Sequence, residues 1–166
     1  MTMNIPLLAE FKHETATTRK MLELVPMDKA DWKPHEKSSR LGPLANHIAD
    51  MLTWTGVTLQ KDGIDFATDF VPKTPKTTTA DLLDYFDKNV ADGIAVLEAT
   101  TDDQLSEMWT MRNGEQVYFT MPKSVTLRQF VFSHIVHHRA QLGVYLRLLD
   151  VPLPSTYGPT ADNPMM

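Results

Sequence analysis

Apolar and polar positions follow one another along the chain with the spacing of four long helices. In each stretch apolar side chains recur every three or four residues, which places them on one face of an α-helix. The expected helices span residues 5–25, 41–59, 79–99 and 126–149. Pro26 ends the first pattern. Thr78 or Thr79 is the expected N-cap of the third helix and Thr126 that of the fourth, because a Thr hydroxyl can accept from a free backbone N–H.

The segments between these helices are rich in proline and polar residues and are expected to be loops. Residues 107–124 differ, because stretches of partly alternating apolar and polar residues flank Asn113 and Gly114. An Asn-Gly pair favours the two-residue turn of a β-hairpin. We therefore expect a short β-hairpin or an irregular extended loop between the third and fourth helices. Residues 150–166 contain four prolines and are expected to form an extended C-terminal tail.

The order of these elements predicts an all-α fold, a four-helix bundle. Strands and helices do not alternate and no internal repeat occurs, so a parallel sheet is not expected. The 166 residues can form one hydrophobic core, and we expect residues 1–166 to be a single domain. The connections are longer than a simple up-down bundle needs, which leaves room for a crossover.

Composition narrows the possible partners and location. Hydrophobic residues make up 42% of the chain and charged residues 22%, as in ordinary globular proteins. The net charge of −5 and the lack of a Lys/Arg cluster argue against nucleic acid or an anionic membrane as a partner. The chain has no cysteine, which excludes disulfides, thiolate metal ligands and a cysteine nucleophile. It shows neither a signal-like N-terminus nor an apolar run of about 18 residues, so a cytoplasmic protein is expected.

Histidines are concentrated in the fourth helix, in the stretch SHIVHHRAQLGVYLRLL at residues 133–149. His134 and His138 are four residues apart, so their side chains lie about 40° apart on the same helix face. That spacing lets two imidazoles share one metal ion. His137 is rotated away from this pair, and we expect it beside the site or at the surface.

A third ligand could come from the second helix, where His47 lies beside the apolar stripe. Metal sites in bundles are built from facing helices in this way. Three histidines would leave at least one coordination position open. His13 could line the same cavity from the first helix. The alternative is that the histidines are ordinary core residues whose nitrogens are satisfied by hydrogen bonds.

Three sequence elements in this order resemble the DinB family of bacterial proteins. The first is Trp32-x-Pro34 followed by Leu44-x-x-His47. The second is the run HIVHHRAQ at residues 134–141, and the third is VPLPSTYGP at residues 151–159. The resemblance covers nearly the whole chain.

The resemblance implies a four-helix bundle with up-down-down-up connections, often dimeric, that holds a divalent metal ion. Zinc or nickel would be bound by His47, His134 and His138. Pro43 and Ala140 depart from the residues common in relatives, but neither is at a ligand position. Because related proteins include thiol-dependent enzymes, the resemblance also implies a low-molecular-weight thiol as a second cofactor.

If His47, His134 and His138 are the ligands, the residues near them can be given expected roles. Gln141 could reach the edge of the site. Arg139 is expected to pair with an acidic residue or with the C-terminal tail. It could also lie next to the metal ligands. Tyr157 and Asp162 could brace the end of the fourth helix.

Three functions follow from these patterns. The leading hypothesis is a metal-dependent enzyme acting on a small-molecule substrate, a thiol S-transferase or a hydrolase, whose catalytic residues besides the ligands are unknown. The second is a non-catalytic, metal-binding protein associated with stress, and the third is a purely structural bundle. The family resemblance also implies a homodimer.

Overall fold

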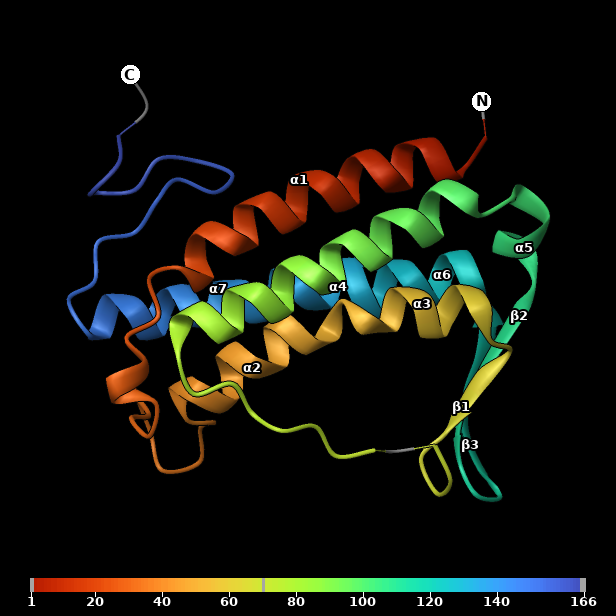
Figure 1. Ribbon diagram of the computed structural model, residues 1–166, viewed down its shortest axis with the longest axis horizontal. Helices are drawn as coiled ribbons and strands as arrows, with labels where there is room; N and C mark the ends of the chain where they lie inside the picture. Colours follow the sequence, from red (N-terminus) through yellow and green to blue (C-terminus); the bar gives the residue numbers. More distant parts are fainter. Residues whose placement is uncertain (1, 70, 165–166) are drawn as a thin grey trace.

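Four long helical segments make up most of the computed structural model, which describes residues 2–69 and 71–164 (Figure 1). These segments are α1 (Asn4–Leu22), α2 (Leu41–Met51) with α3 (Thr53–Gln60), α4 (Thr79–Ala99), and α6 (Lys123–Leu127) with η2 (Arg128–Ser133) and α7 (His134–Leu148). The short elements η1 (Met27–Lys29) and α5 (Asp102–Ser106) lie in the connections. In Figure 1, α1 and α6–α7 run from right to left, whereas α2–α3 and α4 run from left to right.

The hydrophobic core lies between these segments. Its fully buried side chains include Phe11, Leu22, Leu41, Ile48, Leu82, Phe86, Leu97, Leu127 and Leu142. They come from all four segments and recur at helical spacing. The apolar periodicity of the sequence therefore does mark the faces that pack together.

The second helix is interrupted, which the sequence did not indicate. The expected helix 41–59 is divided at Leu52 into α2 and α3. The Thr53 hydroxyl donates to the carbonyl oxygen of Asp50 at 2.8 Å. A Thr side chain that bonds its own backbone in this way competes with the regular helical hydrogen bonds. The chain keeps its direction, because Leu52 retains helical backbone angles.

The fourth helix begins at Lys123, so the prediction that Thr126 caps it is wrong. Thr126 is fully buried inside α6. Pro122 occupies the N-cap position, and the Lys123 backbone N–H donates to the Glu107 carbonyl oxygen at 2.8 Å. The buried Lys123 ammonium pairs with the Glu107 carboxylate at 2.6 Å. By contrast, Thr78 does cap α4, since its hydroxyl accepts from the Asp81 N–H at 3.1 Å.

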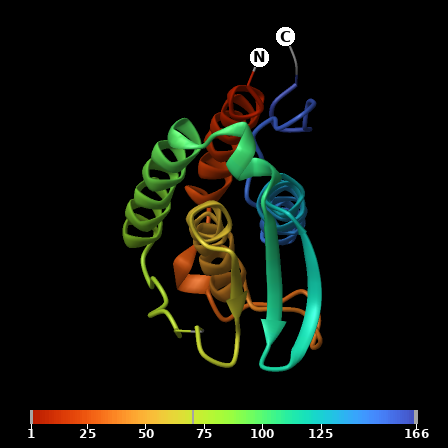
Figure 2. The ribbon, with the colours of Figure 1, turned by 90° about the vertical axis from the view of Figure 1, so that its right-hand side faces the viewer.

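A small sheet corrects the all-α class to a mainly helical fold with three strands in the described residues. They are β1 (Gly63–Asp65), β2 (Met108–Asn113) and β3 (Gln116–Pro122), in the order β1-β2-β3. The antiparallel β2–β3 pair is the expected hairpin, and Gly114 in its turn has a φ of 59°. The sheet lies at one end of the helices, beside α3 and α6 (Figures 1 and 2).

Strand β1 was not expected, and it pairs parallel to β2. It depends on Gly63, where an added Cβ would lie 2.3 Å from the Thr110 carbonyl oxygen. Only glycine allows the two backbones to approach this closely. A three-residue strand is too short to show an alternating pattern.

Residues 150–164 of the C-terminal tail contain no helix, and they are fixed to α1 and α7. The Tyr157 hydroxyl donates to Glu14 Oε1 on α1 at 2.7 Å. Asp162 accepts from the Leu153 N–H at 2.9 Å and also pairs with Arg147 on α7. In residues 2–69 and 71–164, none of the helices combines the length and apolar character that a membrane crossing needs.

Candidate metal centre

The three predicted histidines come together where α2 faces α7. One ring nitrogen from each of His47, His134 and His138 lies within 4.8 Å of those of the other two. The ring centroids of His47 and His138 are 4.6 Å apart, as are those of His134 and His138, and those of His47 and His134 are 5.4 Å apart. This is the single group of three or more potential metal ligands in the part of the chain that the structure describes.

The helix that carries two of these histidines changes its winding just before them. Segment η2 is a π-helix that ends at Ser133, and His134 is the first residue of α7. A π-turn contains one residue more than an α-turn, so it rotates all later residues by about 100° relative to a continuous α-helix. The insertion lets α6 direct Leu127 into the core while α7 still directs His134 and His138 toward α2.

Hydrogen bonds orient the imidazole rings. The Nδ1 atom of His138 lies 2.7 Å from Oε1 of Gln141, which fits Nδ1–H donating to that amide oxygen. In this tautomer the lone pair of His138 is on Nε2. That Nε2 lies 2.8 Å from Nε2 of His134. Gln141 therefore lies at the edge of the site and directs a free lone pair toward the other histidines.

The surroundings keep all three imidazoles neutral. Burial, followed by His138 and His47, lowers the pKa of His134 to about 4. Partial burial of the ring also lowers the pKa of His47 and of His138, opposed by Asp50 in the first case and by Gln141 in the second. A neutral imidazole is the form that binds a metal ion, so the centre needs no deprotonation near pH 7.

This donor set fits a divalent transition metal. Imidazole nitrogens suit zinc and nickel, whereas Ca²⁺ and Mg²⁺ prefer oxygen ligands. Three protein ligands leave a coordination position open, as in catalytic rather than structural zinc sites. His134 and His138 are half-buried and His47 is exposed, so small molecules can reach the centre.

The other residues that the sequence singled out lie around or away from the centre. The exposed His137 ring packs edge-on against His138, with centroids 4.8 Å apart. Arg139 is 3% exposed on another face of α7, where it pairs with Glu14 at 2.7 Å. The expectation that His13 lines the cavity is wrong. Helix α1 turns Phe11 and Glu14 inward, which leaves His13 exposed on its outer face.

A cavity of about 450 Å³ opens beside His47, between α2, α4 and the segment 73–77. Its polar lining includes Asn46, Asp50, Lys73, Lys76 and Tyr85. We call it the α2–α4 cavity. The sequence of segment 73–77 is that of an ordinary polar loop. No periodic pattern connects it with His47, so the cavity was not predicted.

Two side chains of α2 hold this segment in place. Asn46 donates to the Lys76 carbonyl oxygen at 2.9 Å and accepts from the Lys76 N–H at 2.7 Å. Asp50 pairs with the Lys73 ammonium and accepts from the Tyr85 hydroxyl at 2.7 Å. The cavity wall is therefore built on the helix that also carries His47.

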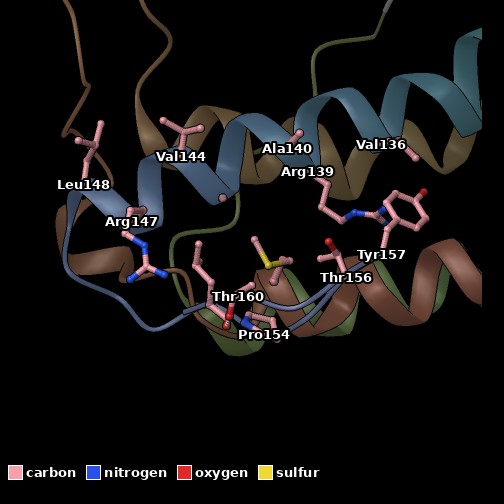
Figure 3. Close-up of a pocket in the computed structure, with 13 residues that line it drawn as sticks. Val136, Arg139, Ala140, Val144, Arg147, Leu148, Pro154, Thr156, Tyr157 and Thr160 are labelled. Carbon is pink, nitrogen blue, oxygen red and sulfur yellow. Dashed lines mark hydrogen bonds between the residues drawn. The ribbon is translucent and has the colours of Figure 1, made fainter. Parts of the chain in front are cut away.

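A second cavity, of about 480 Å³, lies between α7 and the C-terminal tail (Figure 3). Its walls are mainly apolar, with Val136, Val144 and Pro154 among them. Arg139 and Tyr157 also line it, and the Arg139 guanidinium lies 5.2 Å from the Tyr157 ring centroid. The three clustered histidines are not part of its lining, so this cavity is separate from the candidate centre.

Comparisons with known proteins agree with this architecture. The sequence model of the DinB family matches residues 1–164. A DinB-like protein from Bacillus subtilis is similar in structure, with a TM-score of 0.70, 18% identity and coverage of 96% of this chain and 99% of the other. A DinB-like protein from Bacillus cereus gives a TM-score of 0.69, 24% identity, and coverage of 94% and 98%. None of the curated proteins compared matches the sequence significantly.

Proposed function

Because the chain belongs to the DinB family, we propose that His47, His134 and His138 together bind one divalent metal ion, zinc or nickel. The observation that carries this proposal is the convergence of three neutral ring nitrogens within 4.8 Å of one another. The directions of the long helical segments support an up-down-down-up four-helix bundle as the scaffold (Figure 1).

The chain's own residues supply ligands and orientation. Helix α2 would provide one imidazole and α7 two, while Gln141 accepts from the Nδ1–H of His138 and so leaves its Nε2 available as a ligand. A divalent ion in this position would supply Lewis acidity, which favours the thiolate form of a small thiol at neutral pH. The α2–α4 cavity beside His47 offers room for a small reactant.

We propose that the reaction is the transfer of a low-molecular-weight thiol to an electrophile. A C–S bond forms between the thiol sulfur and an electrophilic carbon, the bond from that carbon to its leaving group breaks, and the thiol proton passes to solvent. The leaving group departs as an anion. Support comes from the exposure of His47 and from its place in the lining of the α2–α4 cavity.

The test is turnover by the zinc- or nickel-loaded protein with several small thiols and a chlorinated aromatic acceptor. We expect product formation above the uncatalysed rate, and loss of that excess in a variant with His47, His134 and His138 all replaced by Ala. Equal rates for the two proteins would contradict the transferase proposal.

One observation favours a non-catalytic metal-binding protein as the alternative. Among the described residues that line the α2–α4 cavity, Asp50 is the one carboxylate, and both Lys73 and Tyr85 engage it. Among these described lining residues, no carboxylate is then free to act as a base next to His47. Metal binding without turnover in the assay above would support this alternative.

A further inference from the structure

One cationic group of the α2–α4 cavity, the Lys76 ammonium, forms no ion pair with the residues that the structure describes. Lys73 and Lys76 both line it, together with a single carboxylate, that of Asp50. Asp50 pairs with Lys73, which balances those two charges. In residues 2–69 and 71–164, no carboxylate oxygen lies within ion-pair distance of the Lys76 ammonium. That ammonium instead lies over the Tyr85 ring, 4.9 Å from its centroid.

From this arrangement we propose that the cavity binds the substrate of the metal centre through a carboxylate on that substrate, held by Lys76. The inference rests on the proposed function, because it names the class of molecule that the same site accepts. The substrate would be the small thiol of the proposed reaction, with a single carboxylate at one end and, at the other, a sulfur atom that reaches the open side of the histidine cluster.

The backbone of Lys76 is held close to the helix that carries His47. Its backbone N–H and carbonyl are both held by Asn46, the residue that directly precedes His47 in α2. Two lining residues of the cavity, Lys76 through its backbone and the candidate ligand His47, are thus positioned by neighbouring residues of one helix. Such an arrangement can select a molecule by the distance between its anionic group and its reactive atom.

The remaining walls indicate a molecule with an apolar body and one negative charge. Met27, Ala30, Pro43 and Pro75 give the cavity apolar surface. The volume of about 450 Å³ is in the range of sites for small organic molecules.

The surroundings of Lys76 disfavour a polyanion. Lys76 also borders a second hollow, whose lining includes Asp81, Asp84 and Lys88. The two carboxylates there would repel a molecule that carries several negative charges. A single carboxylate, close to Lys76 and inside the cavity, is the better match.

The experiment compares two probes that differ in one charge. They are 3-mercaptopropionate and its methyl ester, which have the same thiol and nearly the same size. Binding to the cobalt-substituted protein is followed by the thiolate-to-cobalt absorption band. Binding to the metal-free protein is followed by NMR shifts of the Lys76 and Thr77 amides. We expect the acid to bind about tenfold more tightly than the ester in both forms.

Two variants assign this preference to one side chain. Lys76→Met should bind acid and ester equally and keep its cobalt. Lys12→Met removes the same charge from an exposed position on α1, where Lys12 pairs with Glu98 at 3.3 Å, and should keep the full preference. Equal affinities of acid and ester in the wild type, or a preference that survives in Lys76→Met, would overturn the inference.

The two assays separate this inference from the proposed function. If neither probe gives a thiolate–cobalt band, while the metal-free protein still prefers the acid through Lys76, the thiol chemistry is wrong and the carboxylate site stands. If both probes give the band with equal affinity, the thiol chemistry stands and the carboxylate site is wrong.

Discussion

The direction of each ring nitrogen decides what the three histidines can do. Four-residue spacing puts His134 and His138 on one helix face, but it does not determine which nitrogen of each ring is free. Gln141 makes that choice for His138 by accepting from Nδ1–H at 2.7 Å. The sequence indicated that Gln141 reaches the site edge, whereas the tautomer that it selects is visible only in three dimensions.

The lowered pKa of His134 predicts a specific dependence of stability on pH in the metal-free protein. The group titrates at 6.5 when unperturbed and at about 4 in the folded chain. The unfolded chain therefore binds the proton first as pH falls, so the free energy of unfolding decreases between pH 6.5 and about 4. Above pH 6.5 the imidazole is neutral in both states and this group has no effect.

Urea denaturation at a series of pH values measures this effect in the wild type and in His134→Gln. We expect the variant to lose less stability between pH 6.5 and about 4 than the wild type does. Carboxylates that titrate in the same range contribute to both proteins and cancel in the comparison. Parallel curves would show that the pKa of His134 is not lowered in the folded state.

At the scale of helices and strands, the regular helices could be predicted from the sequence, but the interruptions of helices and the added strand could not. The apolar periodicity predicted the long helical segments, and the Asn113-Gly114 pair predicted the hairpin. The division at Leu52, the π-helix η2 and strand β1 were not predictable from periodicity. Each depends on partners far away in the sequence or on a local hydrogen bond that leaves no periodic signal.

The contact of α1 with α4 predicts that Gly93→Ala is destabilising. Gly93 in α4 is buried, and an added Cβ would lie 2.6 Å from Cζ of Phe11 in α1. We expect the free energy of unfolding to fall by about 1–3 kcal/mol, because the helices must separate to admit the methyl group.

Gly143→Ala is the matched control for this substitution. Its added Cβ would lie 3.4 Å from the terminal methyl group of Met21, at the end of a flexible side chain. Helix propensity should then dominate and stabilise α7 by up to about 1 kcal/mol. Thermal denaturation of the two variants measures both effects. A similar loss in both would mean that the α1–α4 contact is not the cause.

The attachment of β1 to the hairpin predicts a second effect of pH. The Asp65 carboxylate accepts from the Gly114 N–H at 2.9 Å and from the Ala67 N–H at 3.0 Å, and it pairs with Arg112 at 3.0 Å. The bond from Gly114 contributes most to holding the pKa of Asp65 below its ordinary value of 3.8. The carboxylate therefore stabilises the sheet fully above pH 3.8, and this contribution is lost as pH falls through the lower, folded-state pKa.

Hydrogen exchange at the Gly114 amide measures this attachment. Asp65→Asn should speed that exchange at neutral pH, because the amide loses a charged acceptor. Glu115→Gln removes a charge from the neighbouring exposed position and should leave the rate unchanged. An unchanged rate in Asp65→Asn would show that the carboxylate does not hold the hairpin turn.

At the scale of the whole molecule, the sequence predicted best those residues whose spacing places them on one face of a helix. His134, His138 and the apolar stripes share such a face, and they could be found from spacing alone. His47 was placed by its position beside the stripe and by family resemblance. The α2–α4 cavity was missed, because Lys73 and Lys76 reach it through contacts with Asp50 and Asn46 across more than 20 residues of sequence.

In the tail, too, the local backbone form could be predicted from the sequence, but the contacts with distant residues could not. Its prolines predicted an extended segment, and the structure fixes that segment through Tyr157 to Glu14 and through Asp162 to Arg147. The sequence indicated that Arg139 pairs with an acidic residue or the tail, but it did not identify Glu14. The cavity in Figure 3 is a product of this docking, since neither α7 nor the tail forms it alone.

The most direct test of the account is the metal content of the purified, untagged protein, measured by elemental analysis beside the double variant His134→Ala/His138→Ala. We predict close to one zinc or nickel ion per chain in the wild type and none in the variant. A wild type without metal, even after anaerobic loading with zinc and with nickel, would contradict the account. The histidines of α7 would then be polar residues that satisfy one another.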